Sequence, residues 1–132
     1  MFIFQEGDKR VPLEICLLRK ISDLEGVIRL LDFYEMPDTF ILIMERPLGS
    51  KDLFDFINDH TFLEESLARN FMRQVVETIH SCHAKGVIHR DIKDENLLVT
   101  VSRSAKPKIQ LIDFGSGAHI RNPIYFDFDG KC

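Results

Sequence analysis

The residues best suited to chemistry are concentrated in one short segment, HRDIKDEN, at positions 89–96. It lies between two apolar runs, Val87-Ile88 and Leu97–Val99. Charged side chains make a poor core, so this segment is predicted to be a surface loop whose two ends are held by buried strands. Loops held in this way often present catalytic groups on a rigid scaffold.

Three oxygen-bearing side chains are expected to meet at this loop. Asp91 and Asn96 lie on it, and Asp113 ends an apolar strand predicted at residues 108–112. Oxygen ligands of this kind suit Mg²⁺, which takes one or two carboxylates together with waters and phosphates. Lys93 adds a positive charge suited to a phosphate oxygen. A carboxylate able to accept a proton, a metal pair and a cation together indicate phosphoryl transfer to a hydroxyl group.

The elements before the loop can be predicted from apolar spacing. Apolar residues recur every four positions from 13 to 21, after Pro12, and predict an amphipathic helix. Two β-rich runs, 27–33 and 39–45, predict a hairpin around a proline-containing turn. Its second strand is apolar throughout residues 40–44 and is therefore expected to be buried on both faces.

The remaining elements are predicted from periodicity and turn residues: helices at 51–58 and 64–83, and strands at 97–99 and 108–112. Thr61 and Glu64 could form a capping box for the longer helix. Gly115, just beyond the last strand, is expected to allow a backbone conformation that a side chain would block.

The amino-acid composition limits the classes of protein to which the chain can belong. The 132 residues make one domain or part of one, and 45% hydrophobic with 29% charged residues indicates a globular, soluble chain. A net charge of −4 argues against nucleic-acid binding, and no apolar run is long enough for a membrane span. The start of the sequence has no signal-peptide pattern, and the three cysteines are widely spaced. We therefore expect no membrane partner and a cytoplasmic location, with the nucleus as a second one.

The loop and the strand end together resemble protein kinases. HRDIKDEN is similar to the kinase catalytic loop, with Ile92 in place of the usual leucine, and Asp113-Phe114-Gly115 is similar to the metal-binding D-F-G. Lys93 stands two residues after Asp91, as in serine/threonine kinases rather than tyrosine kinases. Further segments from about residue 10 to 130 resemble the Pim family: Leu13-Glu14, Glu45–Pro47, DLFDFI at 52–57 and DFGSGA at 113–118.

This resemblance implies roles for the loop residues. It implies Asp91 as the catalytic base, Lys93 as a contact to the transferred phosphate, and Asn96 and Asp113 as Mg²⁺ ligands.

It also implies an ATP pocket. Glu14 is expected to pair with the ATP-binding lysine of the family, and Met44 to lie at the back of the pocket. Glu45 to Pro47 correspond to the hinge beside adenine. Because Pro47 has no N–H, one of the usual hinge hydrogen bonds to adenine cannot form.

Protein partners follow from the same resemblance. Pim-type kinases favour basic, Arg-rich substrates, so Asp52, Asp55 and Glu95 are candidate substrate contacts. A preference for carboxylates at helix N-termini explains Asp52 and Asp55 equally well. The chain is expected to be a monomer.

One structural ion pair is also predicted. Arg90 is expected to pair with Asp127 as first choice and with Asp129 as second, in place of a phosphorylated activation loop.

The predicted fold is α+β and kinase-like, with two lobes, and incomplete, because the glycine-loop strands and the last helices of the large lobe are not recognised. Residues 1–45 are expected to be a small-lobe remnant, 46–50 the hinge, and 51–132 part of the large lobe. The predicted function is ATP- and Mg²⁺-dependent phosphorylation of serine or threonine, with little activity from this segment alone. The alternatives are an inactive kinase-like interaction module and a small-molecule phosphotransferase, which Arg90 and Lys93 oppose.

Overall fold

The computed structural model describes residues 3–6, 9–102 and 105–120. In these residues the helices are α1 (Leu13–Lys20), α2 (Leu53–His60) and α3 (Glu65–Ala84), with a short 3₁₀ turn η1 (Asp94–Asn96). The strands are β1 (Ile3–Glu6), β2 (Lys9–Pro12), β3 (Leu30–Glu35), β4 (Phe40–Met44), β5 (Ser50–Asp52), β6 (Val87–Ile88), β7 (Leu97–Ser102), β8 (Ala105–Leu111) and β9 (Ala118–His119).

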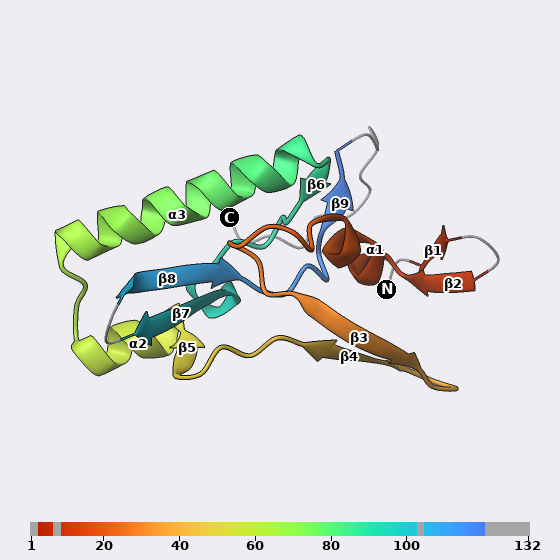
Figure 1. The fold of residues 1–132 in the computed structure, drawn as a ribbon, viewed down its shortest axis with the longest axis horizontal. Coiled ribbons are helices and arrows are strands. Elements are labelled where there is room, and N and C mark those ends of the chain that lie inside the picture. The colour runs from red at the N-terminus through yellow and green to blue at the C-terminus, as the bar shows by residue number, and fades with distance from the viewer. Residues whose placement is uncertain (1–2, 7–8, 103–104, 121–132) are drawn as a thin grey trace.

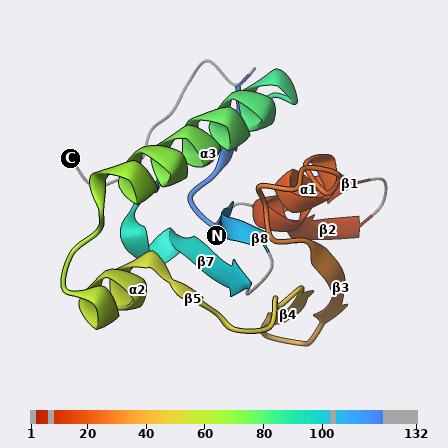
Figure 2. The ribbon, with the colours of Figure 1, turned by 60° about the vertical axis from the view of Figure 1, so that its left-hand side comes forward.

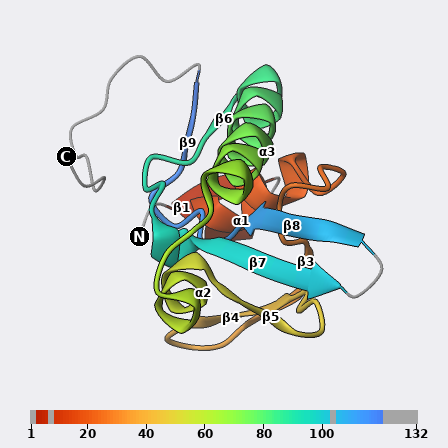
Figure 3. The same ribbon diagram turned by 90° about the vertical axis from the view of Figure 1, so that its left-hand side faces the viewer.

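Strand β7 follows the HRDIKDEN loop, and β8 leads to Asp113. Both belong to a three-stranded antiparallel sheet in the order β5–β7–β8. Helix α3 lies along one side of the β7–β8 hairpin, and α2 lies beside β5 and β7 (Figures 1 and 3). The Phe56 ring of α2 and the Phe71 ring of α3 are 6.0 Å apart, so the two helices are in contact. Strand β6 pairs with β9, which places the segment before the loop beside the segment after the D-F-G sequence. Both sides of the candidate site are therefore held by β-ladders.

The two N-terminal hairpins, β1–β2 and β3–β4, extend away from this sheet, and α1 lies between β1–β2 and the body of the molecule (Figures 1 and 2). The buried α1 residues Leu17 and Leu18, and Ile21 just after the helix, join a core that also contains Phe71, Val75, Val99, Leu111 and Phe114. Apolar burial of this kind is the main favourable term in folding. The core therefore ties α1 directly to the D-F-G segment.

The expectation that β4 is buried on both faces is wrong. Its side chains alternate between partly buried and exposed, and Ile41 and Ile43 are 45% and 41% exposed. Leu42 and Met44 pack against the core on the other face. Successive side chains of a strand point to opposite faces, and this hairpin meets the core on one face only.

The predicted capping box is also wrong. Thr61 is the residue after α2 and has a φ of +67°, while Glu64 precedes α3 and makes no side-chain cap. A side-chain cap is found instead on α2, where the Asp52 carboxylate accepts the backbone N–H of Asp55 at 2.8 Å. Helix α2 begins two residues later than predicted, because Lys51 and Asp52 pair with β7.

None of the helices in the described residues combines the length and hydropathy that a membrane span requires.

Candidate active site

His89 links the catalytic-loop sequence to the strand that leads to Asp113. Its side chain is only 3% exposed. Its Nε2–H donates to the Ile112 carbonyl at 2.9 Å, and its Nδ1 accepts the Asp91 backbone N–H at 3.2 Å. This pattern suits a neutral ring, and burial lowers the pKa of His89 accordingly. No role for His89 was predicted from the sequence, although its place directly before Arg90-Asp91 was the available signal.

Asp91, Lys93 and Asn96 meet around one carboxylate. The Lys93 ammonium lies 2.7 Å from Asp91 Oδ2, and the Asn96 amide donates to the same oxygen at 3.1 Å and to the Asp91 carbonyl at 2.9 Å. The hydrogen bond from Lys93 is the main reason that the pKa of Asp91 is lowered. Asp91 is therefore held ionised and in a fixed orientation.

Asp113 lies next to Asn96 because the two strands are in register. The Ile112 N–H donates to the Asn96 carbonyl at 3.0 Å, one residue beyond the Leu97–Leu111 pair. Asp113 has a φ of +62°, and its Oδ1 accepts the Gly115 N–H at 3.1 Å. Uncommon backbone conformations of this kind cluster at functional sites.

The expected reason for Gly115 is wrong. Left-handed φ values in this segment belong to Asp113, and Gly115 is not among the glycines with positive φ. A Cβ on Gly115 would instead lie 3.0 Å from Asp113 Oδ1 and 3.7 Å from Glu14 Oε2. The glycine therefore leaves room for two carboxylates.

Phe114 anchors this segment in the core. Its side chain is fully buried, and its ring centroid lies 4.6 Å from that of His89. Because His89 holds the backbone of Asp91, this contact couples the D-F-G segment to the catalytic-loop sequence.

Arg90 is also bound to this segment, since its Nε donates to the Ser116 carbonyl at 2.6 Å. Its φ is +68°. The two predicted partners of Arg90, Asp127 and Asp129, lie outside the described residues, so that ion pair stays a prediction.

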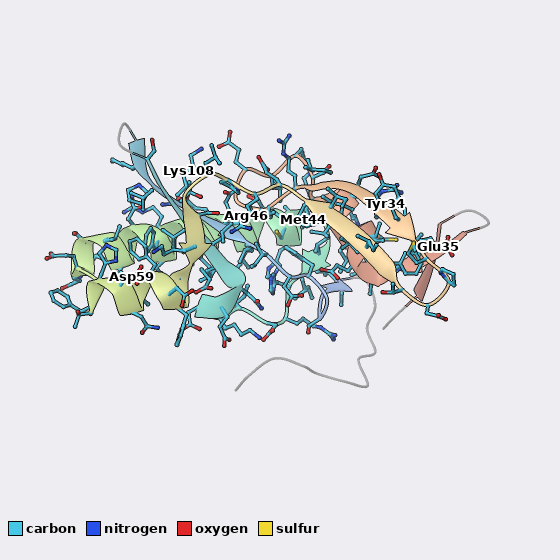
Figure 4. The ribbon with its side chains drawn as sticks, turned by 90° about the horizontal axis from the view of Figure 1, so that it is seen from below. Tyr34, Glu35, Met44, Arg46, Asp59 and Lys108 are labelled. Carbon is cyan, nitrogen blue, oxygen red and sulfur yellow. The ribbon has the colours of Figure 1, made fainter. Side chains whose placement is uncertain are left out.

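A cleft of about 740 Å³ lies between the β3–β4 hairpin and the sheet of β5, β7 and β8. The candidate residues that line it are Glu14, Met44, Glu45, Asp52, Asp55, Glu95 and Asp113. Figure 4 shows Met44 and Arg46 near the middle of the molecule, with Tyr34 and Glu35 at the far end of the hairpin. Asp91, Lys93 and Asn96 are not lining residues, but the contacts described above place them directly beside Asp113.

The residues predicted to form the hinge line two different hollows, and Glu45 lines both. Glu45 lines the cleft, yet its carboxylate binds the Arg29 guanidinium at 3.1 Å, and this hydrogen bond lowers the pKa of Glu45. Pro47 lines a second hollow on the other side of the connector, together with Thr100 and Lys108. The expected position of Pro47 in the nucleotide pocket thus stays a prediction.

Glu14 carries a half-buried carboxylate near Asp113. Burial is the main cause that raises the pKa of Glu14, and the negative charge of Asp113 adds to the effect. A hydrogen bond from the Phe114 backbone N–H partly opposes them. Among the side chains that the structure describes, no lysine or arginine forms a salt bridge with Glu14. The site therefore presents a negative charge suited to a cation.

We expect Glu14→Gln to make the change in the free energy of unfolding from about pH 4 to about pH 7 more favourable to the folded state than in the wild type. A carboxylate whose pKa is raised in the folded state contributes full stability below its unfolded value of 4.5. That contribution is lost as the pH rises through the raised pKa, and glutamine cannot undergo this loss. Urea unfolding of both proteins at the two pH values measures the difference. The exposed Glu77→Gln on α3 is the matched control, and an equal effect of both substitutions would contradict the prediction.

Comparison with known proteins agrees with this geometry. The sequence model of the family described as Protein kinase domain matches residues 3–130. The chain is 44% identical over 128 residues to serine/threonine-protein kinase pim-2 of Danio rerio, covering 91% of this chain and 40% of that protein. It is 46% identical over 123 residues to serine/threonine-protein kinase prk-2 of Caenorhabditis elegans, covering 92% of this chain and 27% of that protein.

A third relative is named for a PAS domain as well as for its kinase activity. The chain is 42% identical over 122 residues to PAS domain-containing serine/threonine-protein kinase of Mus musculus, covering 92% of this chain and 8% of that protein. The chain thus spans two fifths or less of the length of these curated relatives. The family match confirms the predicted α+β, kinase-like fold class. Because that match extends over nearly the whole chain, the chain belongs to the protein kinase domain family.

Proposed function

We propose that the protein containing this chain is a serine/threonine protein kinase that transfers the γ-phosphoryl group of ATP to basic peptide substrates. The observation that carries the proposal is the convergence of Lys93 and Asn96 on the Asp91 carboxylate, directly beside Asp113. This arrangement supplies an orientated base, a cation and two oxygen donors in one place, as phosphoryl transfer to a hydroxyl requires.

Asp91 is proposed to orientate the substrate hydroxyl and to receive its proton. Lys93 and Asn96 occupy Oδ2, which leaves Oδ1 for the hydroxyl. The hydroxyl oxygen forms a bond to the γ-phosphorus, the bond from that phosphorus to the leaving ADP oxygen breaks, and the proton moves to Asp91. The lowered pKa of Asp91 keeps the carboxylate ready to accept that hydrogen bond.

The donor set beside Asp91 fits Mg²⁺. Asn96 uses its amide N–H₂ on Asp91, so its side-chain oxygen can serve as a ligand, and Asp113 contributes a carboxylate. An amide oxygen and a carboxylate match the preference of Mg²⁺ for hard oxygen ligands alongside phosphates and water. When bound, Mg²⁺ neutralises charge on the nucleotide phosphates. We propose that Asn96 and Asp113 hold it.

A preference for basic peptides is proposed from the charges of the cleft. Asp52, Asp55 and Glu95 all line it. Two cations, Arg46 and Lys51, also line the cleft, against six acidic side chains among its described lining residues. Lys51 is paired with Asp59, so the acidic side chains dominate. Opposite charges steer and orientate a partner, with effects that depend on salt.

We expect Asp55→Asn to raise KM for an Arg-rich serine peptide by about threefold to tenfold, with a smaller change for a peptide in which glutamine replaces arginine. Initial rates at low and high salt measure this, and the effect should shrink at high salt. The control is Asp32→Asn, an exposed position on β3 outside the cleft. Equal KM changes for both peptides would argue against a charge contact.

The proposed activity is tested by transfer of radiolabelled γ-phosphate from ATP to an Arg-rich serine peptide. Transfer should require Mg²⁺, should stop with EDTA, and should be absent when alanine replaces the serine. Nucleotide binding without transfer would favour the alternative, an inactive kinase-like interaction module. Transfer to a free small-molecule hydroxyl, with none to peptide, would favour a small-molecule phosphotransferase.

A further inference from the structure

A third hollow, of about 640 Å³, lies away from the cleft and from the hollow beside Pro47. It is lined by Lys20, His83, Ala84, Lys85, Gly86, His119 and Ile120. These residues come from the end of α1, the end of α3 and the segment around β9, which lie together in Figure 1. Four of the seven lining side chains are basic or can become so, and none is acidic.

The positive charge of this hollow is only partly compensated. The Lys85 ammonium lies 2.8 Å from the Asp23 carboxylate. In the described part of the chain, neither Lys20 nor His83 forms a salt bridge. At least one full positive charge therefore faces the hollow without a carboxylate beside it.

The Lys20 ammonium lies close to Gly86, on the side where a side chain would stand. Its Nζ would lie 3.3 Å from a Cβ at Gly86, and Gly86 has a φ of +74° that favours glycine. The His119 ring also donates a hydrogen bond to the Gly86 carbonyl. Two nitrogen-bearing side chains from different elements thus converge on one backbone position.

The position of Lys20 could also be explained by a stabilising interaction with the C-terminus of α3, but this explanation fits less well than an anion site. The last carbonyls of α3 already have donors, because the Lys85 N–H binds the carbonyls of Ser81 and Cys82 and the Gly86 N–H binds that of His83. A cation near a helix C-terminus gains some stability from the dipole, but these carbonyls do not require Lys20 as a donor.

We propose that this hollow binds a doubly charged tetrahedral anion of the phosphate class, either free or as a phosphorylated side chain, between Lys20, His119 and Lys85. The volume exceeds what a monatomic ion needs, and the lining nitrogen donors belong to three different segments, α1, the end of α3 and β9. A bound anion would connect α1, which carries Glu14, to β9, which follows the D-F-G segment. This inference is independent of the proposed kinase activity.

The charges around the hollow imply that anion binding depends on pH. Among the described residues that line the hollow, the charged or titratable groups near His119 are Lys20 from α1, and His83 and Lys85 from the end of α3, with Asp23 paired to Lys85. Burial and the Lys20 charge lower the pKa of His119, and an anion between them would oppose the second effect. Anion binding should therefore be tighter at acidic pH, where His119 is protonated.

The first test titrates sulfate into the protein and follows the Gly86 amide and the His119 ring by NMR. Sulfate keeps its charge between about pH 5.5 and about pH 8, so any change in affinity reports on the protein. We expect saturable shifts at both residues, with a Kd that rises about threefold or more in Lys20→Gln and recovers in Lys20→Arg. The control is Lys108→Gln, an exposed lysine on β8 outside the hollow, which should leave the Kd unchanged.

The source of the anion is distinguished by two further ligands, inorganic phosphate and N-acetyl-phosphoserine amide. Equal affinity indicates a free anion, and tighter binding of the phosphoserine compound indicates a phosphorylated side chain. Shifts that stay linear with sulfate concentration, or that respond equally to Lys20→Gln and Lys108→Gln, would overturn the proposal. A separate variant, His119→Gln, should remove the pH dependence of sulfate affinity. An unchanged pH dependence in this variant would also contradict the proposal.

Discussion

Asp91→Asn is expected to lower kcat for peptide phosphorylation by about 10²–10⁴-fold, the range typical for loss of a positioned general base. Asparagine has the same shape and can still accept the hydrogen bonds from Lys93 and Asn96 through its side-chain oxygen. It cannot accept a proton from the substrate hydroxyl. KM for ATP should change little, since Asp91 is not a lining residue of the cleft. The measurement is initial-rate kinetics of radiolabelled transfer.

The matched control for this substitution is Asp94→Asn. Asp94 lies on the same segment, and its carboxylate accepts only the neighbouring Glu95 N–H among its described hydrogen bonds. We expect it to keep most of the activity. If Asp91→Asn retained more than about a tenth of the wild-type kcat, Asp91 would not be acting as the base.

Phe114→Ala is expected to lower the free energy of unfolding by about 3–5 kcal/mol, as for other fully buried aromatic residues. The side chain has no exposed surface and contacts the His89 ring. A whole domain is stable by only about 5–15 kcal/mol, so this loss would leave a large unfolded population in a marginal protein. Urea unfolding followed by circular dichroism measures it.

Phe62→Ala provides the matched comparison, because Phe62 is 68% exposed between α2 and α3. A surface substitution of this kind should change stability by no more than about 0.5 kcal/mol. Equal losses for Phe62→Ala and Phe114→Ala would mean that the core around Phe114 is not packed as described. A smaller variant, Phe114→Leu, should lose less than Phe114→Ala, because it leaves a smaller cavity.

Linear spacing was sufficient to predict the centre of the candidate site. Asp91, Lys93 and Asn96 lie within one short loop, so chain connectivity alone keeps them close together. Asp113 could be added because two apolar strands with a turn between them form an antiparallel pair, which brings the residues at its ends side by side. Asp52, Asp55 and Glu95 were also predicted, and they do line one cleft, although their role in substrate binding remains a prediction.

Predictions from local sequence patterns were wrong where more than one structure is compatible with the same pattern. Thr61 and Glu64 have the spacing of a capping box, yet the chain leaves α2 with Thr61 in a left-handed conformation, and Glu64 then precedes α3 without capping it. The apolar run of β4 indicated a strand, but not how many of its faces would be covered. Whether a face of a strand is buried depends on elements that are distant in the sequence. The periodicity within the strand carries no information about those elements.

Residue types at short separations were enough to predict the protein kinase family, the three helices, the β3–β4 and β7–β8 hairpins and the loop residues, but not the strands β1, β2, β5 and β9. Only the tertiary structure decided that Phe114 packs on His89, that Glu14 lies near Asp113, and that Lys20 lies over Gly86. These pairs are joined by contacts between segments far apart in the chain. Their burial and charge, and therefore the pKa values and binding properties that follow, exist only after the core has brought those segments together.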